Sequence, residues 1–280
     1  MNRSGSGSNR RPPIPFLKMS AAGNDFIVIA AGSLPAARFD PRFVQQVCRR
    51  RVSVGADGVI LVEKKRSDLL GVAFYNPDGR ETFCGNGARC AARYGAIREG
   101  MPAEMLLETL RGTLRAELLT DGVRLEIGAC GVLRQDLSIP LGSRTIRGIL
   151  IDVGVPHLVT FDLDPEEIDV VALGREIRNH PLTGPEGANV DFARQVGSGL
   201  LEVRTYERGV EDETLSCGTG CIAAALAAAV LGLGTSPTVC RTRSGANLRV
   251  AFHLAGERFE KVILEGEARV VYSGELVNEA

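Results

Sequence analysis

The chain has 280 residues, of which 44% are hydrophobic, and its formal net charge is −1. That length is enough for one large domain or for two domains of ordinary size. The near-neutral charge argues against a basic surface for nucleic acid or anionic lipid, and no apolar stretch reaches the roughly 20 residues of a membrane-spanning helix. We therefore expect a globular protein without a nucleic-acid or membrane partner.

Residues 1–15 are rich in Ser, Gly, Arg and Pro and lack a hydrophobic segment, so we expect a disordered tail and no signal peptide. Seven cysteines follow at irregular spacing. Without a secretion signal, this cysteine usage indicates reduced thiols in a cytoplasmic protein. The cysteines form no Cys-x-x-Cys pair, and His157, His180 and His253 are scattered, so no metal site is expected.

The first half alternates short apolar runs with two helical segments. Asp40-Pro41 has the N-cap and first-turn proline of a helix that should run to about Arg50. A second helix should follow Cys84 and end near Arg98. The expected strands are residues 26–30, 59–62, 72–76, 105–109, 113–119 and 123–127.

The second half repeats this plan after a crossover that we expect at residues 128–142. A helical segment should begin at Asp164, and a long alanine-rich helix should follow Cys217. The expected strands are residues 148–153, 158–161, 190–193, 200–206, 238–242, 248–252 and 262–264. Residues 267–277 read as a last strand pair that returns to the first half. This pattern predicts an α+β protein of two pseudo-symmetric domains, with the active site between them.

One four-residue motif, Cys-Gly-x-Gly, occurs once in each half. Cys84-Gly85-Asn86-Gly87 and Cys217-Gly218-Thr219-Gly220 each join a thiol to a Gly-x-Gly hinge and a helix. Backbone N–H groups and the positive end of the helix dipole converge there, which lowers a thiol's pKa. The alternative is a pair of buried structural cysteines, the usual fate of a free Cys. The duplication favours a functional pair facing one cleft. The other cysteines lack this context and should pack in the core: Cys48, Cys90, Cys130, Cys221 and Cys240.

Neither of two common cofactors is supported. Residues 218–223 satisfy the Gly-x-Gly-x-x-Ala dinucleotide pattern, but an acidic segment precedes them, and no acid follows at the distance that holds a ribose. The few lysines do not lie in a setting that suits pyridoxal phosphate. Paired thiols without a cofactor indicate acid–base chemistry.

The chain resembles the diaminopimelate epimerase family over nearly its whole length after the tail. The matching phrases, in order, are residues 23–26, 76–79, 84–89, 156–157, 189, 206–209 and 216–220. The resemblance implies a fold of two domains, residues 16–130 and 131–268, each with mostly antiparallel strands around a central helix, and residues 269–280 joining the first domain. It also implies a cofactor-independent isomerase that converts L,L-diaminopimelate to the meso form for lysine and peptidoglycan synthesis, and a homodimer.

The resemblance assigns roles to individual residues. Cys84 would be the base toward L,L-diaminopimelate and Cys217 the acid, with the roles reversed for the meso form, so the pair titrates as one unit. The backbone at Gly85, Asn86, Gly218 and Thr219 would hold the α-carboxylate. The distal end of the substrate would be bound by Asn24, Asn76, Asn189, Glu207 and Arg208. His157 would support the site, or it could be a satisfied turn histidine.

The chain departs from some relatives at two contact positions. Gly58 stands where they have glutamine, and Val155 where they have asparagine. A neighbour or water would then replace those contacts, or the distal pocket differs. Two alternatives remain: a proline or hydroxyproline racemase of the same fold, and a catalytically silent amino-acid-binding homologue. A racemase needs no distal recognition, and a silent homologue has no need of both cysteines.

Overall fold

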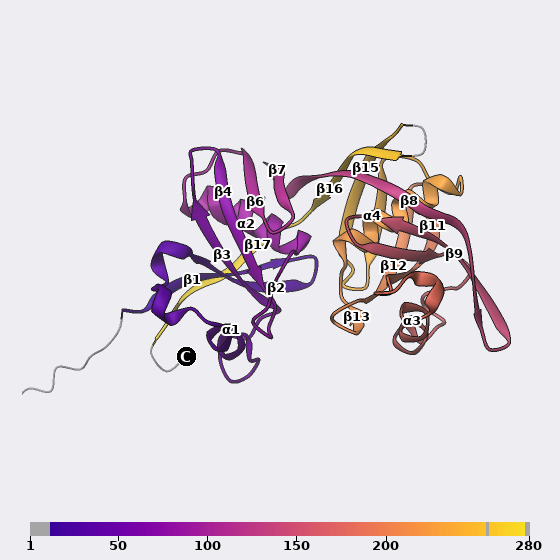
Figure 1. Cartoon of the computed structure of the whole chain (residues 1–280). Helices are drawn as coiled ribbons and strands as arrows, with labels where there is room; N and C mark the ends of the chain where they lie inside the picture. Colours follow the sequence, from indigo (N-terminus) through magenta and orange to yellow (C-terminus); the bar gives the residue numbers. More distant parts are fainter. Residues whose placement is uncertain (1–11, 256–257, 278–280) are drawn as a thin grey trace, which may run out of the picture.

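The computed structural model describes residues 12–255 and 258–277. It consists of two strand-rich lobes, each wrapped around one helix (Figure 1). The expected tail lies mostly outside the described residues. Its boundary was wrong, however, because Ile14 and Pro15 are already part of the first strand.

The first half contains seven strands, two α-helices and two 3-10 helices within the described residues. They are β1 (Ile14–Ala21), β2 (Asn24–Ala30), η1 (Ala31–Ser33), η2 (Ala36–Arg38), α1 (Pro41–Cys48), β3 (Gly58–Lys64), β4 (Leu69–Tyr75), β5 (Glu81–Thr82), α2 (Gly85–Arg98), β6 (Glu104–Thr109) and β7 (Gly112–Leu118). Asp40 caps α1 as expected, its carboxylate accepting the Phe43 N–H at 2.8 Å.

The second half supplies the remaining elements. They are β8 (Val123–Leu141), β9 (Arg144–Asp152), β10 (Pro156–Thr160), α3 (Val170–Arg178), η3 (Pro181–Thr183), β11 (Asn189–Gly197), β12 (Leu200–Glu207), β13 (Asp212–Thr214), α4 (Gly218–Val230), β14 (Thr238–Thr242), β15 (Asn247–Ala255), β16 (Arg258–Gly266) and β17 (Arg269–Leu276).

The two halves share one strand order. In the first, β2 and β3 are parallel, β3 and β4 antiparallel, and β4 and β6 parallel, with α1 and α2 as the crossovers. In the second, β10, β11, β12 and β14 pair in the same sequence, with α3 and α4 as the crossovers. The registers match, so that Ile60 opposite Phe74 corresponds to Asp191 opposite Thr205.

The structure refines one expectation about elements and corrects two others. The crossover at residues 128–142 is part of a long strand, because β8 continues through it, pairing first with β7 and β16 and then with β9. The helix expected from Asp164 begins later, with Asp169 as its N-cap, because Asp164 caps only a turn by accepting the Glu166 N–H. The last segment is a single strand, β17, which pairs antiparallel with β1.

The central helices are buried because their sequences are built of small residues. Ala223 to Ala228 in α4 are all fully buried beneath the second-half strands. Ala88, Ala91 and Ala92 play the same part in α2. Small side chains allow strands to approach on every side of a helix, and so the sheet can wrap around it. Each helix therefore starts at a fixed point inside its lobe.

Candidate active site

The two sequence-predicted thiols occupy matching positions at the starts of the central helices. Cys84 is the N-cap of α2, and its sulfur accepts the Gly87 N–H at 3.4 Å. Cys217 is the N-cap of α4, and its sulfur accepts the Gly220 N–H at the same distance of 3.4 Å. Extended backbone at each N-cap turns the chain from a strand into the helix and fixes the sulfur over the first turn.

The first turns of α2 and α4 face one another. A Cβ built on Gly218 would lie 3.7 Å from Asn86 Oδ1, and 3.0 Å from the Leu264 side chain. The same Leu264 methyl group lies 3.9 Å from a Cβ built on Gly85. The structure thus brings both Gly-x-Gly hinges together across the boundary between the lobes. Cys84 is half-buried and Cys217 is buried.

Both thiols titrate above the ordinary range for cysteine, which corrects the expectation drawn from the helix dipole. Burial raises the pKa of Cys84 to about 11, opposed by the hydrogen bond from the Gly87 N–H. Burial, then the carboxylates of Glu207 and Asp191, raise the pKa of Cys217 well above its usual value. The Thr219 hydroxyl, 3.3 Å from the Cys217 sulfur, and the Gly220 N–H act in the opposite direction. Desolvation outweighs the helix terminus in the unliganded chain.

A directed row of hydrogen bonds supports the first hinge. The Arg89 guanidinium donates to Asn86 Oδ1 at 2.7 Å, and Asn86 Nδ2 donates to Asn24 Oδ1 at 2.7 Å. Asn24 Nδ2 then donates to Asp57 Oδ2 at 3.1 Å. The Asn24 and Asn86 side chains are therefore held in place by this row of hydrogen bonds.

A second row supports the other hinge. Asn189 Nδ2 lies 3.2 Å from His157 Nε2, and His157 Nδ1 lies 2.7 Å from Asp191 Oδ2. The other Asp191 oxygen accepts the Thr205 hydroxyl at 2.7 Å. All four side chains are buried, on β10, β11 and β12. His157 is thus a buried histidine at the start of β10, and both of its ring nitrogens have partners.

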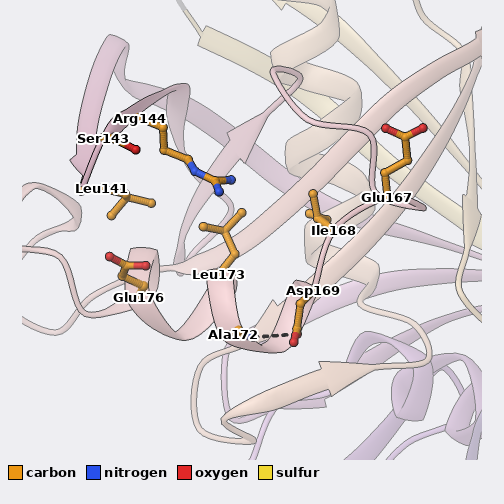
Figure 2. A pocket seen from close by; sticks show the side chains of 10 residues that line it. Leu141, Ser143, Arg144, Glu167, Ile168, Asp169, Ala172, Leu173 and Glu176 are labelled. Atoms are coloured by element: carbon orange, nitrogen blue, oxygen red, sulfur yellow. Dashed lines mark hydrogen bonds between the residues drawn. The ribbon is translucent and has the colours of Figure 1, made fainter.

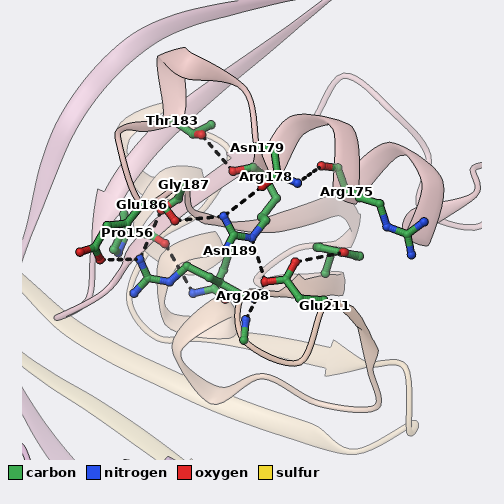
Figure 3. Close-up of polar contacts among 12 residues, drawn as sticks. Pro156, Arg175, Arg178, Asn179, Thr183, Glu186, Gly187, Asn189, Arg208 and Glu211 are labelled. Atoms are coloured by element: carbon green, nitrogen blue, oxygen red, sulfur yellow. Dashed lines mark hydrogen bonds and ion pairs between the residues drawn. The ribbon is translucent and has the colours of Figure 1, made fainter.

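Asn189 also links this row to the arginine predicted to bind substrate. Its Oδ1 accepts the backbone N–H of Arg208 at 2.7 Å, and the Arg208 guanidinium lies 3.3 Å from Glu186 and 3.5 Å from the Gly187 carbonyl (Figure 3). Because Glu186 is 82% exposed, its ion pair with Arg208 is a weak one at the rim. The guanidinium is therefore held only weakly by Glu186.

Glu207 and Asn76 occupy matching positions, each directly after the tyrosine near the end of its strand. Burial raises the pKa of Glu207, with the neighbouring Thr214 hydroxyl acting in the opposite direction. The Glu207 carboxylate also raises the pKa of both Cys84 and Cys217. Asn76 opens the turn after β4 and has no side-chain hydrogen bond among the described residues.

The structure explains one of the two departures from the family pattern. A Cβ at Gly58 would lie 2.6 Å from the Phe74 ring and 2.6 Å from the Tyr75 carbonyl oxygen. No side chain fits there without displacing the core, so the contact made by glutamine in relatives has no counterpart at this position. Val155 lies at the turn before β10, and nothing in the structure explains its replacement of asparagine.

Two surface hollows lie away from the thiols. The larger, about 570 Å³, lies between the tip of the β8–β9 hairpin and the start of α3, and it is lined by Arg144, Glu167 and Leu173 among others (Figure 2). The second, about 490 Å³, is lined by residues of β12, β14 and the turn that follows β14. Neither contains a sequence-predicted site residue, so we do not assign the reaction to them.

Neither a metal-binding cluster nor a helix able to span a membrane is present within residues 12–255 and 258–277. No cluster of three or more His, Cys, Asp or Glu side chains has the geometry of a metal site there. None of the helices in that part of the chain has the length and hydropathy needed to cross a membrane. All seven cysteines are free, and the five assigned to the core are buried.

Sequence reasoning missed Asp191 and gave no role to Arg89. Asp191 lies within the apolar strand β11, and Arg89 lies in the buried small-residue helix α2; both are 0% exposed. In the sequence, each is a single charged residue within an apolar segment that is expected to be buried. Charged side chains are almost never fully buried unless they are paired, so such a residue is a signal of a special role. Thr205, which accompanies Asp191, has no such signal.

Comparisons with known proteins agree with this architecture. The family profile described as diaminopimelate epimerase matches residues 16–132 and 149–271. The diaminopimelate epimerase of Hydrogenobaculum sp. (strain Y04AAS1) is 36% identical over 274 residues, covering 92% of this chain and 97% of the relative. That of Archaeoglobus fulgidus is 39% identical over 248 residues, covering 83% and 87% respectively.

Solved structures of lower identity share the fold. A hydroxyproline epimerase from Agrobacterium vitis has a TM-score of 0.71 at 17% identity, covering 96% of this chain and 93% of that chain. A methylitaconate-delta-isomerase has a TM-score of 0.63 at 13% identity, covering 97% of each chain. The predicted two-domain α+β fold is therefore confirmed. By its profile match and by the identity of its relatives, the chain belongs to the diaminopimelate epimerase family.

Proposed function

We propose that this chain epimerises L,L-diaminopimelate to meso-diaminopimelate with Cys84 and Cys217 as the two acid–base groups. The observation that carries the proposal is the pair of matching N-cap thiols on helices whose first turns face one another. Two opposed groups suit the inversion of an α-carbon, because the proton leaves from one face and a proton returns on the other. A single base would have to move around the substrate.

The substrate loses one proton to one cysteine and gains one proton from the other. The Cys84 thiolate takes the α-proton of the L,L substrate, and the Cα–H bonding electrons remain on carbon. The Cys217 thiol then delivers its proton to the opposite face and becomes the thiolate. Reaction of the meso form runs through the same steps in reverse. Exchange of protons with solvent returns the free enzyme to its starting state, and no redox step is involved.

The hinges can hold the α-carboxylate while charge develops on carbon. The first intrahelical bonds are those from the Ala88 N–H to the Cys84 carbonyl and from the Cys221 N–H to the Cys217 carbonyl. The N–H groups of Gly85, Asn86, Gly218 and Thr219 therefore precede the helical ladder. Those of Gly85, Gly218 and Thr219 are available to an anion, while that of Asn86 faces the Cys84 sulfur in the unliganded chain. Donors from both sides would stabilise the charge that spreads into the carboxylate in the transition state.

The raised thiol pKa values give the substrate a part in forming the thiolate. Burial disfavours the thiolate of Cys84 in the unliganded chain. An α-ammonium bound between the thiols would add a positive charge beside them and lower their pKa values. The reactive thiolate would then form mainly when the substrate is in place, which limits side reactions of a free thiolate.

Recognition of the far end of the substrate is assigned to the residues around Arg208. Its guanidinium would release Glu186 and bind the distal carboxylate, ideally as a bidentate pair. Asn189 holds the backbone at Arg208, and we propose Asn76 as a further polar contact. Glu207, whose carboxylate raises the pKa of both thiols, would bind an ammonium group.

The alternative reaction is racemisation of proline or hydroxyproline, because a hydroxyproline epimerase shares this fold. Proline has no second amino-acid group, so it would leave Arg208 without a function. The test is incubation with L,L-diaminopimelate and, separately, with L-proline in deuterium oxide. We expect deuterium at the α-carbon of diaminopimelate and formation of the meso product. Exchange into proline alone would overturn the assignment.

Two further properties are the oligomeric state and the cellular location. We propose a homodimer from the family resemblance, to be tested by the mass of the chain in solution. We propose a cytoplasmic location because all seven cysteines are free, as in a reducing compartment. Analytical ultracentrifugation and fractionation of the producing cells test these two points separately.

A further inference from the structure

Two fully buried charges of opposite sign lie near the two thiols, one in each half. Arg89 and Asp191 are both 0% exposed. Neither forms an ion pair with a group of firm opposite charge among the described residues; the ring of His157 is the only ionisable partner of Asp191 there. Unpaired buried charges are costly, and a chain that carries two of them in matching halves calls for a functional explanation.

Arg89 is held by neutral oxygens only. Its Nη2 donates to Asn86 Oδ1 at 2.7 Å, and its Nε donates to the Glu267 carbonyl at 3.3 Å. Its Nη1 is buried without a hydrogen-bond partner among the described residues. Burial lowers the pKa of Arg89, but guanidinium groups stay protonated in proteins, so the positive charge remains.

The charge on Asp191 follows from the direction of its hydrogen bonds. Asn189 Oδ1 accepts the Arg208 N–H, so its Nδ2 must be the donor toward His157 Nε2. His157 Nε2 is then the acceptor, which leaves its proton on Nδ1, where it is donated to Asp191. His157 is thus neutral, and Asp191, which accepts from both His157 and Thr205, is the ionised carboxylate.

Asp191 also touches the turn that holds the Cys217 sulfur. A Cβ built on Gly220 would lie 2.3 Å from Asp191 Oδ1 and 2.7 Å from the Thr205 hydroxyl. Gly220 is the residue whose N–H donates to the Cys217 sulfur. The carboxylate therefore lies against the first turn of α4 and competes with a Cys217 thiolate for the positive end of the same helix.

The matching positions in the opposite halves carry no charge. Arg89 is the fifth residue after Cys84, and the fifth residue after Cys217 is Ile222. Asp191 corresponds by strand register to Ile60. At these matched positions, only the first half has a cation, Arg89, and only the second half has an anion, Asp191.

We propose that Arg89 and Asp191 are positioning residues that polarise the thiol pair, so that the first thiolate to form is that of Cys84 while Cys217 retains its proton. This inference rests on the proposed two-base reaction and deepens it. Glu207 cannot make the distinction, because its carboxylate raises the pKa of both thiols. Arg89 lowers the pKa of Cys84, and Asp191 raises that of Cys217.

The other groups that face the thiols leave the direction unchanged. Around Cys84 these are the Gly87 and Asn86 N–H groups of α2 and Glu207 of β12. Around Cys217 they are Thr219 and Gly220 of α4, together with Glu207. Both thiols have an N-terminal helix turn and share Glu207. The two buried charges therefore add to the deeper burial of Cys217, which raises the pKa of that thiol in the same direction.

The test is alkylation by iodoacetamide at fixed pH near 8, with the modification of each cysteine followed separately by peptide mass spectrometry. In Asp191→Asn the amide oxygen can accept the His157 hydrogen bond and the amide nitrogen can donate to the Thr205 hydroxyl, so the main change is loss of the charge. A pKa lowered by about one unit should speed alkylation of Cys217 about three- to fourfold, because the gain in thiolate is partly offset by its lower nucleophilicity. The rate at Cys84 in the same sample should stay unchanged.

Arg89→Met is the reciprocal variant and should slow alkylation of Cys84 about threefold, leaving Cys217 unchanged. Arg89→Lys retains the positive charge and should restore the rate. Thr205→Val is the structural control, since it removes a hydrogen bond to Asp191 and leaves the carboxylate, so it should not speed Cys217. Far-ultraviolet circular dichroism shows whether each variant is folded.

Equal effects of Asp191→Asn on both cysteines, or faster Cys217 alkylation in Thr205→Val, would overturn the proposal. If one variant does not fold, the variants at the other charge still decide. In the wild-type chain, thiolate formation, followed by alkylation rate against pH, should have its midpoint at lower pH for Cys84 than for Cys217. The reverse order would refute the polarisation. None of these readouts needs turnover, so failure of the proposed epimerisation would appear only in the deuterium assay.

Discussion

The matched glycines Gly87 and Gly220 give a sharp test of how the two hinges are supported. Each donates its N–H to the cysteine that begins its helix. An added methyl group meets different surroundings in each case. At Gly220 it would lie 2.3 Å from Asp191 Oδ1 and 2.7 Å from the Thr205 hydroxyl, whereas at Gly87 it would lie 3.3 Å from side-chain carbons of Ile60 and Phe74.

The expected change in the free energy of unfolding therefore differs between Gly220→Ala and Gly87→Ala. In Gly220→Ala the overpacking costs about 1–3 kcal/mol, and loss of a hydrogen bond to the charged Asp191 adds about 1.5–3 kcal/mol. We therefore expect the free energy of unfolding to fall by roughly 2.5–6 kcal/mol. In Gly87→Ala a few tenths of an ångström of adjustment suffices, and the helical gain of up to about 1 kcal/mol for Ala over Gly offsets it. The net change there should lie within about 1 kcal/mol of zero.

Urea unfolding of the two variants beside the wild type measures this difference, and α-proton exchange in deuterium oxide reports the site. We expect Gly220→Ala to lose stability and exchange together. A Gly220→Ala protein as stable as the wild type, or a Gly87→Ala protein equally destabilised, would refute the argument that Asp191 and Thr205 fill the space under the second hinge.

Further outcomes follow from the same structure. Asn189→Ala leaves two buried polar groups without partners, so it should cost about 1–3 kcal/mol of stability and raise KM for diaminopimelate, as urea unfolding and initial rates will show. Burial raises the pKa of Glu207, so the folded chain binds the Glu207 proton more tightly than the unfolded chain does. The stability of the wild type should therefore fall relative to that of Glu207→Gln as pH rises from 4 to 8, which thermal unfolding measures. Activity should increase with pH between 6 and 8, because one thiol must ionise. Mild oxidation should inactivate the enzyme reversibly by joining Cys84 to Cys217, detectable as a reducible cross-linked peptide, and full activity with both thiols free after treatment would contradict this.

Much of the fold could be predicted because its signals are local. The starts of α2 and α4 follow from a cysteine, a Gly-x-Gly hinge and a run of small residues, and the structure places both helices there. The continuation of β8 through residues 128–142 could not be predicted, because its pairing partners are β16 and β9 and its run is interrupted by glycines. Strand pairing at long sequence distance leaves no local pattern.

The candidate site divides in the same way. The thiols and the hinge residues could be named from the repeated phrase and the family resemblance. The support beneath them could not, since Asp191 acts through contacts to His157, Thr205 and Gly220 that only the folded chain creates. The direction of the thiol pKa was also mistaken from sequence, because the helix terminus is visible there and the degree of burial is not.

The central claim is that two thiols act on opposite faces of one carbon. Its most direct test is reaction of L,L-diaminopimelate in deuterium oxide with the wild type, Cys84→Ala and Cys217→Ala, each checked for folding. We predict meso product carrying one deuterium at the inverted carbon with the wild type, and loss of epimerisation in both variants. A Cys217→Ala enzyme that still forms the meso product at the wild-type rate would contradict the two-base account.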